Sequence, residues 1–331
     1  LVKEELLRFD GTRLFPERRS YTVQYALTPP EQDLYVAVTE YVREQFNLAE
    51  RYAADGRKRA AVGFALTTLQ RRLASSPAAI HKSLERRMKR LERELRDAET
   101  NATAVAAASD LLASLGDLDD LDLDDLTDEE REALEDQVSS SVTAAANPEE
   151  LRAEIALLAP LVEQAAVIRN SPSYAKWDRL RETLDDAEQM RDESGARRKL
   201  ILFTEHKDTL EDIVGRLRNH IGREDAVVVI HGGIRREERK KAVERFRTDD
   251  SCIFLVATDA AGEGVNLQNA HLLINFDLPW NPNRIEQRFG RVHRIGQQYM
   301  CHMWSLVAKD TREGDVYVRL LEKLEQQRLA L

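Results

Sequence analysis

A row of arginines near residue 290 has the residue types and spacing for phosphoryl-transfer chemistry. Arg288, Arg291 and Arg294 recur every three residues within RIEQRFGRVHRIGQ, residues 284–297. Three cations on neighbouring turns of one predicted helix face repel one another unless an anion lies among them. A guanidinium is planar, always charged and forked, which suits it to the charge that spreads over a transferring phosphoryl group. The apolar residues of the segment are expected to pack the opposite side of the helix: Ile285, Phe289, Val292 and Ile295.

Other parts of a nucleotide-hydrolysing site are missing from the sequence. No G-x-x-x-x-G-K-[ST] loop is present to hold nucleotide phosphates. Asp128-Glu129 follows no apolar strand, so it is not a credible magnesium-binding pair. The seven histidines show no metal-ligand spacing with cysteine or glutamate, and we predict no metal site. The chain thus carries arginines suited to nucleotide hydrolysis without the residues that would hold the phosphates and Mg²⁺.

Two further loops follow apolar segments that read as strands. Thr204 ends LILFT, and the polar residues after it include Asp208, a candidate helix cap; alone, this is best explained as an ordinary polar loop. Gly232 and Gly233 follow AVVVI and precede a basic helix. Glycines let a backbone approach closely, and a helix N-terminus with cations suits a nucleic-acid phosphate. A tight turn before a solvated helix explains the second loop equally well.

A third loop, ATDAAGEGVNL, follows the apolar segment CIFLVA and begins at Ala257. Thr258 lies at the strand end, and Gly262 and Gly264 permit a sharp bend in which backbone amides can face a ligand. Asn266 has a side chain that can hydrogen-bond a ribose hydroxyl. Two glycines alone are weak evidence for a site.

After residue 197 the sequence alternates short apolar strands with amphipathic helices. Continuous apolar strands of this kind are typical of a parallel sheet covered by helices on both faces, so the predicted fold is α/β. In such sheets ligands bind beyond the carboxyl ends of the strands. The strands are expected at 200–204, 226–230, 252–257, 271–276 and 301–307, and the helices at 208–220, 235–247, 282–294 and 314–330.

The N-terminal part reads as a mainly helical insertion behind a connector. Residues 1–55 are expected to form the connector, with a short strand at 21–27, and a first helix, and residues 56–196 the insertion. Two helices are expected between 56 and 98, and two more are expected to begin at Pro148, capped by Asn147, and at Pro172, capped by Ser171. Residues 99–147 are rich in Ala, Ser, Thr and Asp and are predicted to be flexible or partly helical. Residues 197–331 form the predicted α/β domain.

Composition and charge bound the class of protein. The 331 residues include 42% hydrophobic and 33% charged residues and only two cysteines, which fits a reducing cytoplasm rather than a disulfide scaffold. No run of eighteen apolar residues is present, so we expect no membrane partner. The net charge is −10, but residues 197–331 hold 23 basic and 20 acidic residues, net +3. Global charge is therefore a poor guide to nucleic-acid binding. Because the chain begins at Leu1 with no leader, we expect it to be a piece of a longer protein.

The four loops, in this order, resemble the C-terminal RecA-like lobe of superfamily-two helicases, close to the Swi/Snf-like branch of DNA-dependent ATPases and translocases. LILFTEHKDTLE resembles motif IV of that family, ATDAAGEGVNLQNAHLLINFDLPWNP resembles motif V with its extension, and RIEQRFGRVHRIGQ resembles motif VI. The HRIGQ ending is specific to this branch. The resemblance is strong over residues 198–308 and weaker over 12–50. It implies a RecA-like parallel sheet.

The resemblance also implies roles for particular residues. Arg291 and Arg294 would be arginine fingers that reach the γ-phosphate across a cleft between two lobes. Gln287, Gly262, Glu263, Gly264 and Asn266 would lie in the ATP site, and Thr204, Gly232, Gly233 and Thr258 along the DNA phosphates. ATP and Mg²⁺ would be held mainly by an N-terminal RecA-like lobe of the same chain, so the 331 residues alone are expected to bind neither and to be inactive.

Three functions follow, and we favour the first. The chain is half of an ATP-driven translocase on double-stranded DNA, with a possible protein target for remodelling, in a prokaryotic-type cytoplasm. Alternatively it is the C-terminal lobe of an RNA helicase, against which the HRIGQ ending and the long insertion argue. Alternatively it is a non-catalytic RecA-like module that binds a partner, which the absent phosphate loop favours for these residues alone.

Overall fold

The computed structural model divides the chain into two compact units. One comprises residues 28–174 and is helical, and the other comprises 1–27 together with 175–331 and contains the sheet. We call them the helical unit and the sheet unit. The structure describes residues 14–52, 56–100, 128–186, 188–259, 266–279, 281–309, 311, 314, 315, 317 and 318.

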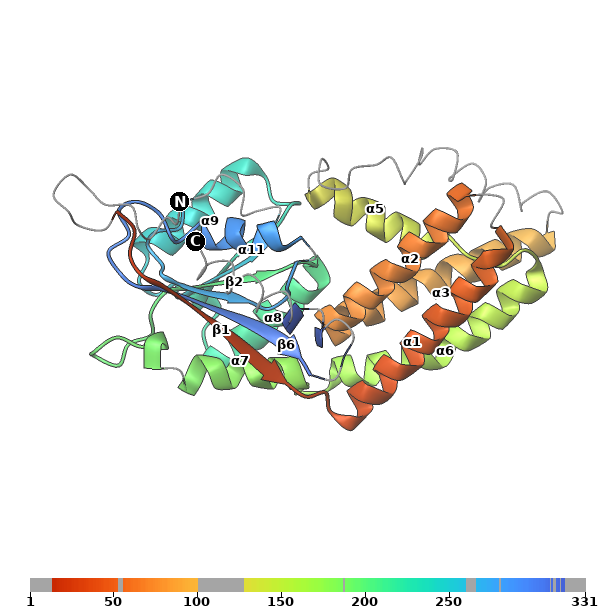
Figure 1. Cartoon of the computed structure of the whole chain (residues 1–331), viewed down its shortest axis with the longest axis horizontal. Coiled ribbons are helices and arrows are strands. Elements are labelled where there is room, and N and C mark those ends of the chain that lie inside the picture. Colours follow the sequence, from red (N-terminus) through yellow and green to blue (C-terminus); the bar gives the residue numbers. More distant parts are fainter. Residues whose placement is uncertain are drawn as a thin grey trace. The chain divides into compact units, whose positions relative to one another are not determined.

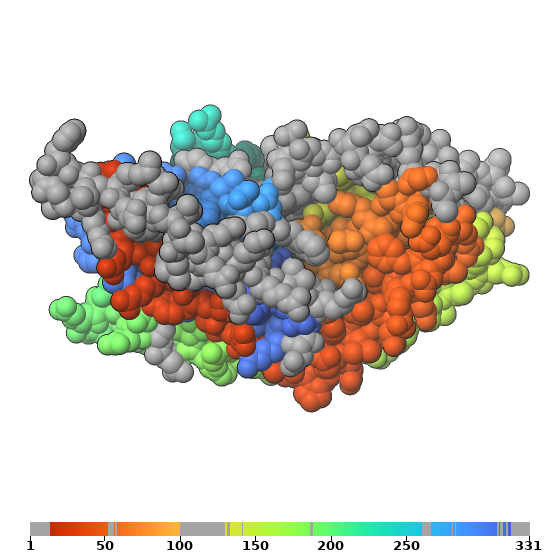
Figure 2. All heavy atoms as spheres, viewed as in Figure 1, coloured from red at the N-terminus to blue at the C-terminus, as the bar shows by residue number. Residues whose placement is uncertain are grey.

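The helical unit is built from amphipathic helices that bury one apolar face each. Their bounds are α1 Pro29–Ala49, α2 Gly56–Ser75, α3 Pro77–Thr100, α5 Asp128–Ser141 and α6 Pro148–Asn170. Asn147 caps α6, as predicted: its side chain accepts from the backbone N–H of Glu150, and Pro148 occupies the first turn. Val38, Leu66 and Leu84 are fully buried, one from each of the first three helices. In the space-filling view, α1 and α2 cover one side of this unit in orange and red (Figure 2).

Part of the segment predicted to be flexible forms helix α5. Val138 is fully buried on it, and two carboxylates pair with α2: Arg71 with Glu135 at 2.6 Å and Arg72 with Asp136 at 2.5 Å. Charge pairing with a neighbouring helix thus supports a helix that has little apolar periodicity of its own. Residues 101–127 of the predicted flexible segment lie outside the described residues.

The sheet unit contains six parallel strands in the order β1-β6-β5-β2-β4-β3. Residues Leu200 to Thr204 of β2 are all buried, because β2 lies between β4 and β5 and helices cover both faces. The α/β fold with a RecA-like parallel sheet and a helical region before it is therefore confirmed. The strands are β1 Arg18–Tyr25, β2 Leu200–Thr204, β3 Val227–Ile230, β4 Phe254–Thr258, β5 Leu272–Asn275 and β6 Cys301–Ala308.

In the part of the chain that the structure describes, the helices that cover the sheet include α7 Ala175–Asp186, α8 Lys207–Ile221, α9 Arg236–Thr248 and α11 Pro282–Phe289. Figure 1 shows α7 on one side of the sheet and α9 and α11 on the other. The core on the second side joins Phe203 and Ile201 of β2 to Phe246 of α9 and Phe289 of α11. Alternate residues of each strand therefore serve the two faces, and the carboxyl ends of the strands are left at one edge.

Several predicted boundaries differ from the structure. Helix α7 begins at Ala175 rather than Pro172, because the Ser171 N–H bonds to Ile168 O and ends α6. Consequently α7 belongs to the sheet unit, whereas α1 belongs to the helical unit. Helix α8 begins after His206, so Asp208 lies in its first turn and is not its cap. Helix α11 ends at Phe289, not Arg294. Of the predicted helix 314–330, only residues 314, 315, 317 and 318 are described.

Candidate functional site

The carboxyl edge of the sheet gathers polar side chains from segments far apart in sequence. Thr204 ends β2, Thr258 ends β4, and Asn275 ends β5, with β2 pairing directly to both neighbours. All three side chains are buried. Because every strand is parallel, this is the edge at which open α/β sheets bind ligands.

Asp277 is the centre of one buried cluster at this edge. Its carboxylate accepts a hydrogen bond from the Thr204 hydroxyl, one from the backbone N–H of Glu205 at 3.2 Å, and one from Lys176 Nζ at 2.6 Å. Burial alone would raise the pKa of Asp277, but Lys176 and these hydrogen bonds outweigh it and lower the pKa to about 2. Thr204, predicted to face DNA, therefore has its hydroxyl directed to Asp277 and is fully buried.

Lys176 is a residue of this cluster that the sequence did not reveal. It lies in the first turn of α7, and its ammonium also lies 4.4 Å from the centroid of the Phe276 ring. A lysine that is only 5% exposed is rarely found without an anionic partner. In the sequence, Lys176 stands near a predicted helix start inside the predicted insertion, so nothing there indicates that it contacts the sheet.

Arg288 occupies a second buried cluster and is not available to a ligand. Its guanidinium makes a forked ion pair with Asp259, and it also donates to Asn275 Oδ1 at 3.0 Å and to the carbonyl of Asp277 at 2.6 Å. It is only 2% exposed. The expected row of three arginines on one helix face is therefore wrong, because this one joins the ends of β4 and β5 to α11.

Arg291 and Arg294 lie in turns beyond the end of α11. Both are half-buried, and Arg294 Nε donates to the carbonyl of Gly290 at 2.8 Å. No carboxylate pairs with Arg294 among the residues that the structure describes. Gln287, predicted to lie beside them, is exposed on α11. Thus Arg291 and Arg294 remain partly exposed, in a turn that contacts the residues before β1 and β5, while Arg288 is enclosed.

The apolar side of the arginine segment is only partly as predicted. Ile285, Phe289 and Val292 are buried, but Ile295 is 58% exposed because the helix has already ended. His293 is buried instead: its ring stacks on Phe289, and its Nε2 lies 2.8 Å from the carbonyl of Pro16. His293 thereby joins the arginine segment to the residues before β1.

The glycine loop after β4 is described only at its two ends. Gly262, Glu263 and Gly264 lie outside the described residues, so their predicted roles stay predictions. Asn266 is exposed, and its side chain bonds to Gln268. At the other end Thr258 is buried, and its hydroxyl has no hydrogen-bond partner among the described residues. A buried hydroxyl of this kind, at a strand end, is suited to a ligand atom.

The loop after β3 is a tight turn in which the Ile234 N–H bonds to the carbonyl of His231 at 3.1 Å. Gly232 and Gly233 form its middle, and a Cβ at Gly233 would come within 3.3 Å of the His231 ring. Exposed cations follow at the start of α9: Arg235, Arg236, Lys240 and Lys241. The glycines therefore keep the turn compact, and a basic surface stands beside it.

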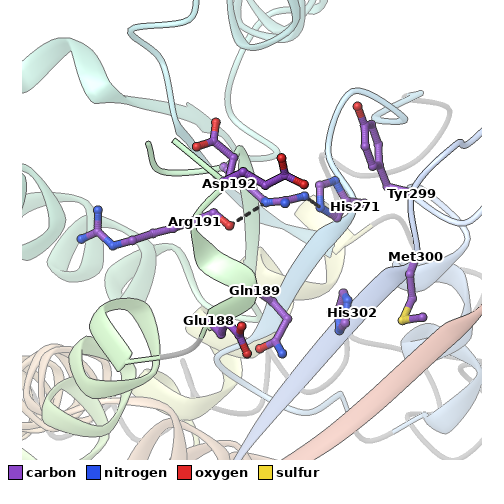
Figure 3. Close-up of a pocket in the computed structure, with 10 residues that line it drawn as sticks. Glu188, Gln189, Arg191, Asp192, His271, Tyr299, Met300 and His302 are labelled. Carbon is purple, nitrogen blue, oxygen red and sulfur yellow. Dashed lines mark hydrogen bonds between the residues drawn. The ribbon is translucent and has the colours of Figure 1, made fainter. Parts of the chain in front are cut away.

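A pocket of about 430 Å³ lies at the opposite, amino edge of the sheet (Figure 3). Arg198 crosses it, donating to the carbonyl of Arg191 at 2.9 Å and contacting His271 Nε2 at 3.1 Å. Tyr299 stacks on His271 with ring centroids 5.0 Å apart. Burial and the neighbouring Arg198 lower the pKa of His271 to about 4, so its ring is neutral at pH 7. This pocket is separate from the carboxyl edge.

Within the described ranges, no three of His, Cys, Asp and Glu gather as they would around a metal ion. No helix among the described residues has the length and apolar character to cross a membrane.

Residues 175–296 match the family described as the helicase conserved C-terminal domain, beginning at the first residue of α7. An uncharacterized ATP-dependent helicase, YqhH, of Bacillus subtilis (strain 168) is 39% identical over 127 residues, which is 38% of this chain and 22% of that protein. Human chromodomain-helicase-DNA-binding protein 1 is 36% identical over 105 residues, 31% of this chain and 6% of that protein.

The structure of the C-terminal part of the Fun30 ATPase domain covers 92% of this chain and 89% of its own, with a TM-score of 0.51 and 18% identity, which shows a shared fold. Residues 175–296 are a helicase conserved C-terminal domain, and the similarity to these relatives supports the C-terminal lobe of a Swi/Snf-like superfamily-two helicase. The helicase domain contains the whole of both buried clusters at the carboxyl edge. The chain spans 22% or less of the length of the two relatives named.

Proposed function

We propose that this chain is the C-terminal half of an ATP-dependent translocase on double-stranded DNA, in which Arg291 and Arg294 complete an ATP site held mainly by another lobe. The observation that carries the proposal is the contrast among the three arginines. Arg288 is enclosed by Asp259 and Asn275, whereas Arg294 has no carboxylate partner among the described residues and lies half-exposed beyond the end of α11. A cation left in this state suits an anion supplied from outside.

The residues present fit part of an ATP site and no more. The guanidinium groups of Arg291 and Arg294, the exposed amide of Gln287 and the amide of Asn266 can contact phosphate and ribose oxygens. ATP with Mg²⁺ would supply the phosphoryl group that is transferred to water. No phosphate loop is present in the 331 residues, so we assign the phosphates and Mg²⁺ to a partner lobe.

In the proposed mechanism, closing of the two lobes would bring Arg291 and Arg294 to the oxygens of the phosphoryl group that is transferred, where negative charge develops. Arg288 does not move toward the nucleotide; its forked pair with Asp259 keeps the end of β4 beside α11. Product release lets the lobes reopen, and alternate closing and opening moves the protein along a phosphate backbone. The fingers stabilise the transition state and contribute less to binding of the ground state.

Double-stranded DNA is the nucleic acid we propose, and chemistry on this edge supports a phosphate backbone. The exposed cations at the start of α9 stand beside the Gly232-Gly233 turn, and the Thr258 hydroxyl lies at the end of β4 without a partner among the described residues. Such groups bind backbone without reading sequence. Comparing stimulation of the ATPase by duplex DNA and by structured RNA tests this choice, and a preference for RNA would overturn it.

The decisive experiment replaces Arg291 with alanine in the full-length protein. Loss of a finger of this kind costs about three to five decades of rate in related phosphoryl-transfer enzymes. We expect DNA-stimulated ATPase to be abolished while ATP binding, measured with a fluorescent nucleotide, stays nearly intact. Arg181→Ala is the matched control, because Arg181 is an exposed arginine of the same unit that pairs with Asp178 on its own helix. Normal turnover by Arg291→Ala would refute the finger assignment.

A second measurement concerns the 331 residues alone. Without the lobe that holds the phosphates, the purified chain should show no ATPase above background. Measurable turnover would contradict a two-lobe site and would leave the non-catalytic, partner-binding alternative equally unsupported.

A further inference from the structure

The turn that carries Arg291 and Arg294, residues 290–297, is hydrogen-bonded through a glutamine side chain to the segment that follows the glycine loop, residues 266–270. Gln297 Nε2 donates to the carbonyl of Gln268 at 2.9 Å and to that of Ala270 at 3.1 Å. Its Oε1 accepts from the backbone N–H groups of Gln298 and Tyr299 at 3.0 and 3.1 Å. The Val292 carbonyl lies 3.4 Å from the same nitrogen. Both the nitrogen and the oxygen of the amide are thus hydrogen-bonded.

A second glutamine, Gln268, donates in the opposite direction, from the segment 266–270 to the segment 291–297. Gln268 Nε2 donates to the carbonyl of Ile295 at 2.8 Å, and the backbone N–H of Leu267 donates to the carbonyl of Arg291 at 3.2 Å. Asn266 Nδ2 donates in turn to Gln268 Oε1 at 3.1 Å. The segments 266–270 and 291–297 are therefore joined in both directions, and we call these contacts the glutamine clamp.

The backbone and the core make this clamp specific. Gly296 has φ +99°, a left-handed conformation that residues with a Cβ rarely adopt, and it turns the chain so that Gln297 faces residues 268–270. Leu267 and Val292 are buried beneath the clamp, at 1% and 0% exposure. The two segments therefore have little freedom to slide, and the Arg291 backbone is held on both sides.

At the other end of the glycine loop, Asp259 is held to α11 by Arg288. The described residues on either side of 260–265 are thus fixed to the same arginine segment, one side by an ion pair and the other by the clamp. A displacement of residues 266–268 would be felt directly at Arg291.

We propose that Gln297 and Gln268 are positioning residues, which hold the turn bearing Arg291 and Arg294 in the geometry needed for phosphoryl transfer. The inference rests on the proposed function, because it acts through the two arginines. Neither glutamine contacts substrate itself. Since a misplacement of about 1 Å can cost about 100-fold in rate, loss of the clamp should lower kcat far more than it changes binding.

The test is Gln297→Glu in the full-length protein. The change keeps the size of the side chain but turns its donor nitrogen into a second oxygen, which then faces the carbonyls of Gln268 and Ala270. We expect DNA-stimulated kcat to fall about 10- to 100-fold, with little change in KM for ATP and in Tm. Gln298→Glu is the matched control, because it introduces the same charge one residue away on an exposed side chain, and it should retain wild-type kcat.

Two further variants make the outcome decisive. Gln268→Ala removes the return bond without adding charge and should lower kcat in the same direction by a smaller factor, which covers the case in which Gln297→Glu fails to fold. In an Arg294→Ala background, Gln297→Glu should add less to the loss of kcat than it does alone, since both act at one turn.

The possible results separate this inference from the proposed function. If Arg291→Ala retains full ATPase, the finger assignment fails and the inference with it. If Arg291→Ala abolishes ATPase while Gln297→Glu and Gln268→Ala keep wild-type kcat, only the inference is overturned. Equal losses from Gln297→Glu and Gln298→Glu, or a loss that only follows a lowered Tm, would also overturn it.

Discussion

Two buried arginines, Arg87 in the helical unit and Arg288 in the sheet unit, use the same chemistry to different ends. Arg87 donates to Glu154 at 2.7 Å, to the Tyr41 hydroxyl at 2.7 Å, and to the backbone carbonyls of Ser139 in α5 and Val142 just after it. Every partner comes from the helices or their connection. Arg288 donates instead to the ends of β4 and β5, where polar side chains gather at the ligand-binding edge.

The difference lies in what surrounds each arginine. Around Arg87 the carboxylate of Glu154 is also bonded by Thr143 and Tyr41, so the cluster is closed among the helices. Next to Asp259, the partner of Arg288, lies Thr258, whose hydroxyl has no partner among the described residues. We infer that the first cluster stabilises its unit and that the second also sets the geometry of a site.

Breaking the Arg87 cluster should have the largest effect on stability. Arg87→Met leaves Glu154 buried without its cation, and removing one partner of a buried pair costs about 3–5 kcal/mol of the free energy of unfolding. Chemical denaturation followed by circular dichroism measures it. Lys89→Met is the control on the same helix, because its exposed pair with Glu85 is worth about 0.3–0.5 kcal/mol. A loss below about 1 kcal/mol from Arg87→Met would show that the cluster relaxes or admits water.

Paired arginine-to-lysine changes compare the two clusters directly. Arg288→Lys keeps the charge but loses the fork, leaving Asn275 or the Asp277 carbonyl without its donor, at a cost of about 1–3 kcal/mol. We expect this variant to lose at least about tenfold in DNA-stimulated kcat per folded molecule. Arg87→Lys should cost similar stability and leave that kcat unchanged. Equal effects on kcat would remove the distinction between the clusters.

The sequence predicted the sheet well because local patterns decide it. The apolar runs around Leu202, Val228 and Val256 form the predicted strands, and Asn147 with Pro148 starts α6 as expected. Each of these signals lies within a few residues of the element it predicts. That the loops after the strands meet at one edge follows from the parallel α/β pattern, whereas the order of the strands is known only from the structure.

The identity of the enclosed arginine could not be predicted in the same way. Arg288 and Arg291 look equivalent in sequence, and only the positions of Asp259 and Asn275, brought together by the sheet, distinguish them. Lys176 was missed for the same reason, since its partner Asp277 is 101 residues away. Helix α5 depends on Arg71 and Arg72 of another helix. Pairings between distant residues are not contained in local periodicity.

Acid titration should show how much the buried Asp277 contributes to the stability of the sheet unit. Its pKa is lowered to about 2 from the ordinary 3.8, so the folded state favours the carboxylate. The stability contributed is present above about pH 4 and is lost as the pH falls through 2, and it amounts to about 2 kcal/mol at most. Asp277→Asn should remove this slope from denaturation curves between pH 4 and 2, whereas Asp33→Asn, at an exposed position of α1, should leave it. An unchanged slope in Asp277→Asn would assign it to other carboxylates.

The smallest effect should come from an arginine whose partner carries no charge. Arg198 donates only, so His271 Nε2 must accept, and the neutral ring must carry its proton on Nδ1. Because the pKa of His271 is lowered to about 4, the unfolded chain binds a proton more readily between pH 6.5 and 4, and stability falls as the pH drops through that range. For a half-buried ring we expect about 1 kcal/mol after allowing for solvent screening. Arg198→Met should raise the pKa of His271 in an NMR titration, and a wild-type value near 6.5 would show that the contact does not persist in solution. Burial and an arginine facing a neutral acceptor thus together lower the proton affinity of His271 at little gain in stability, which separates this contact from both buried ion pairs.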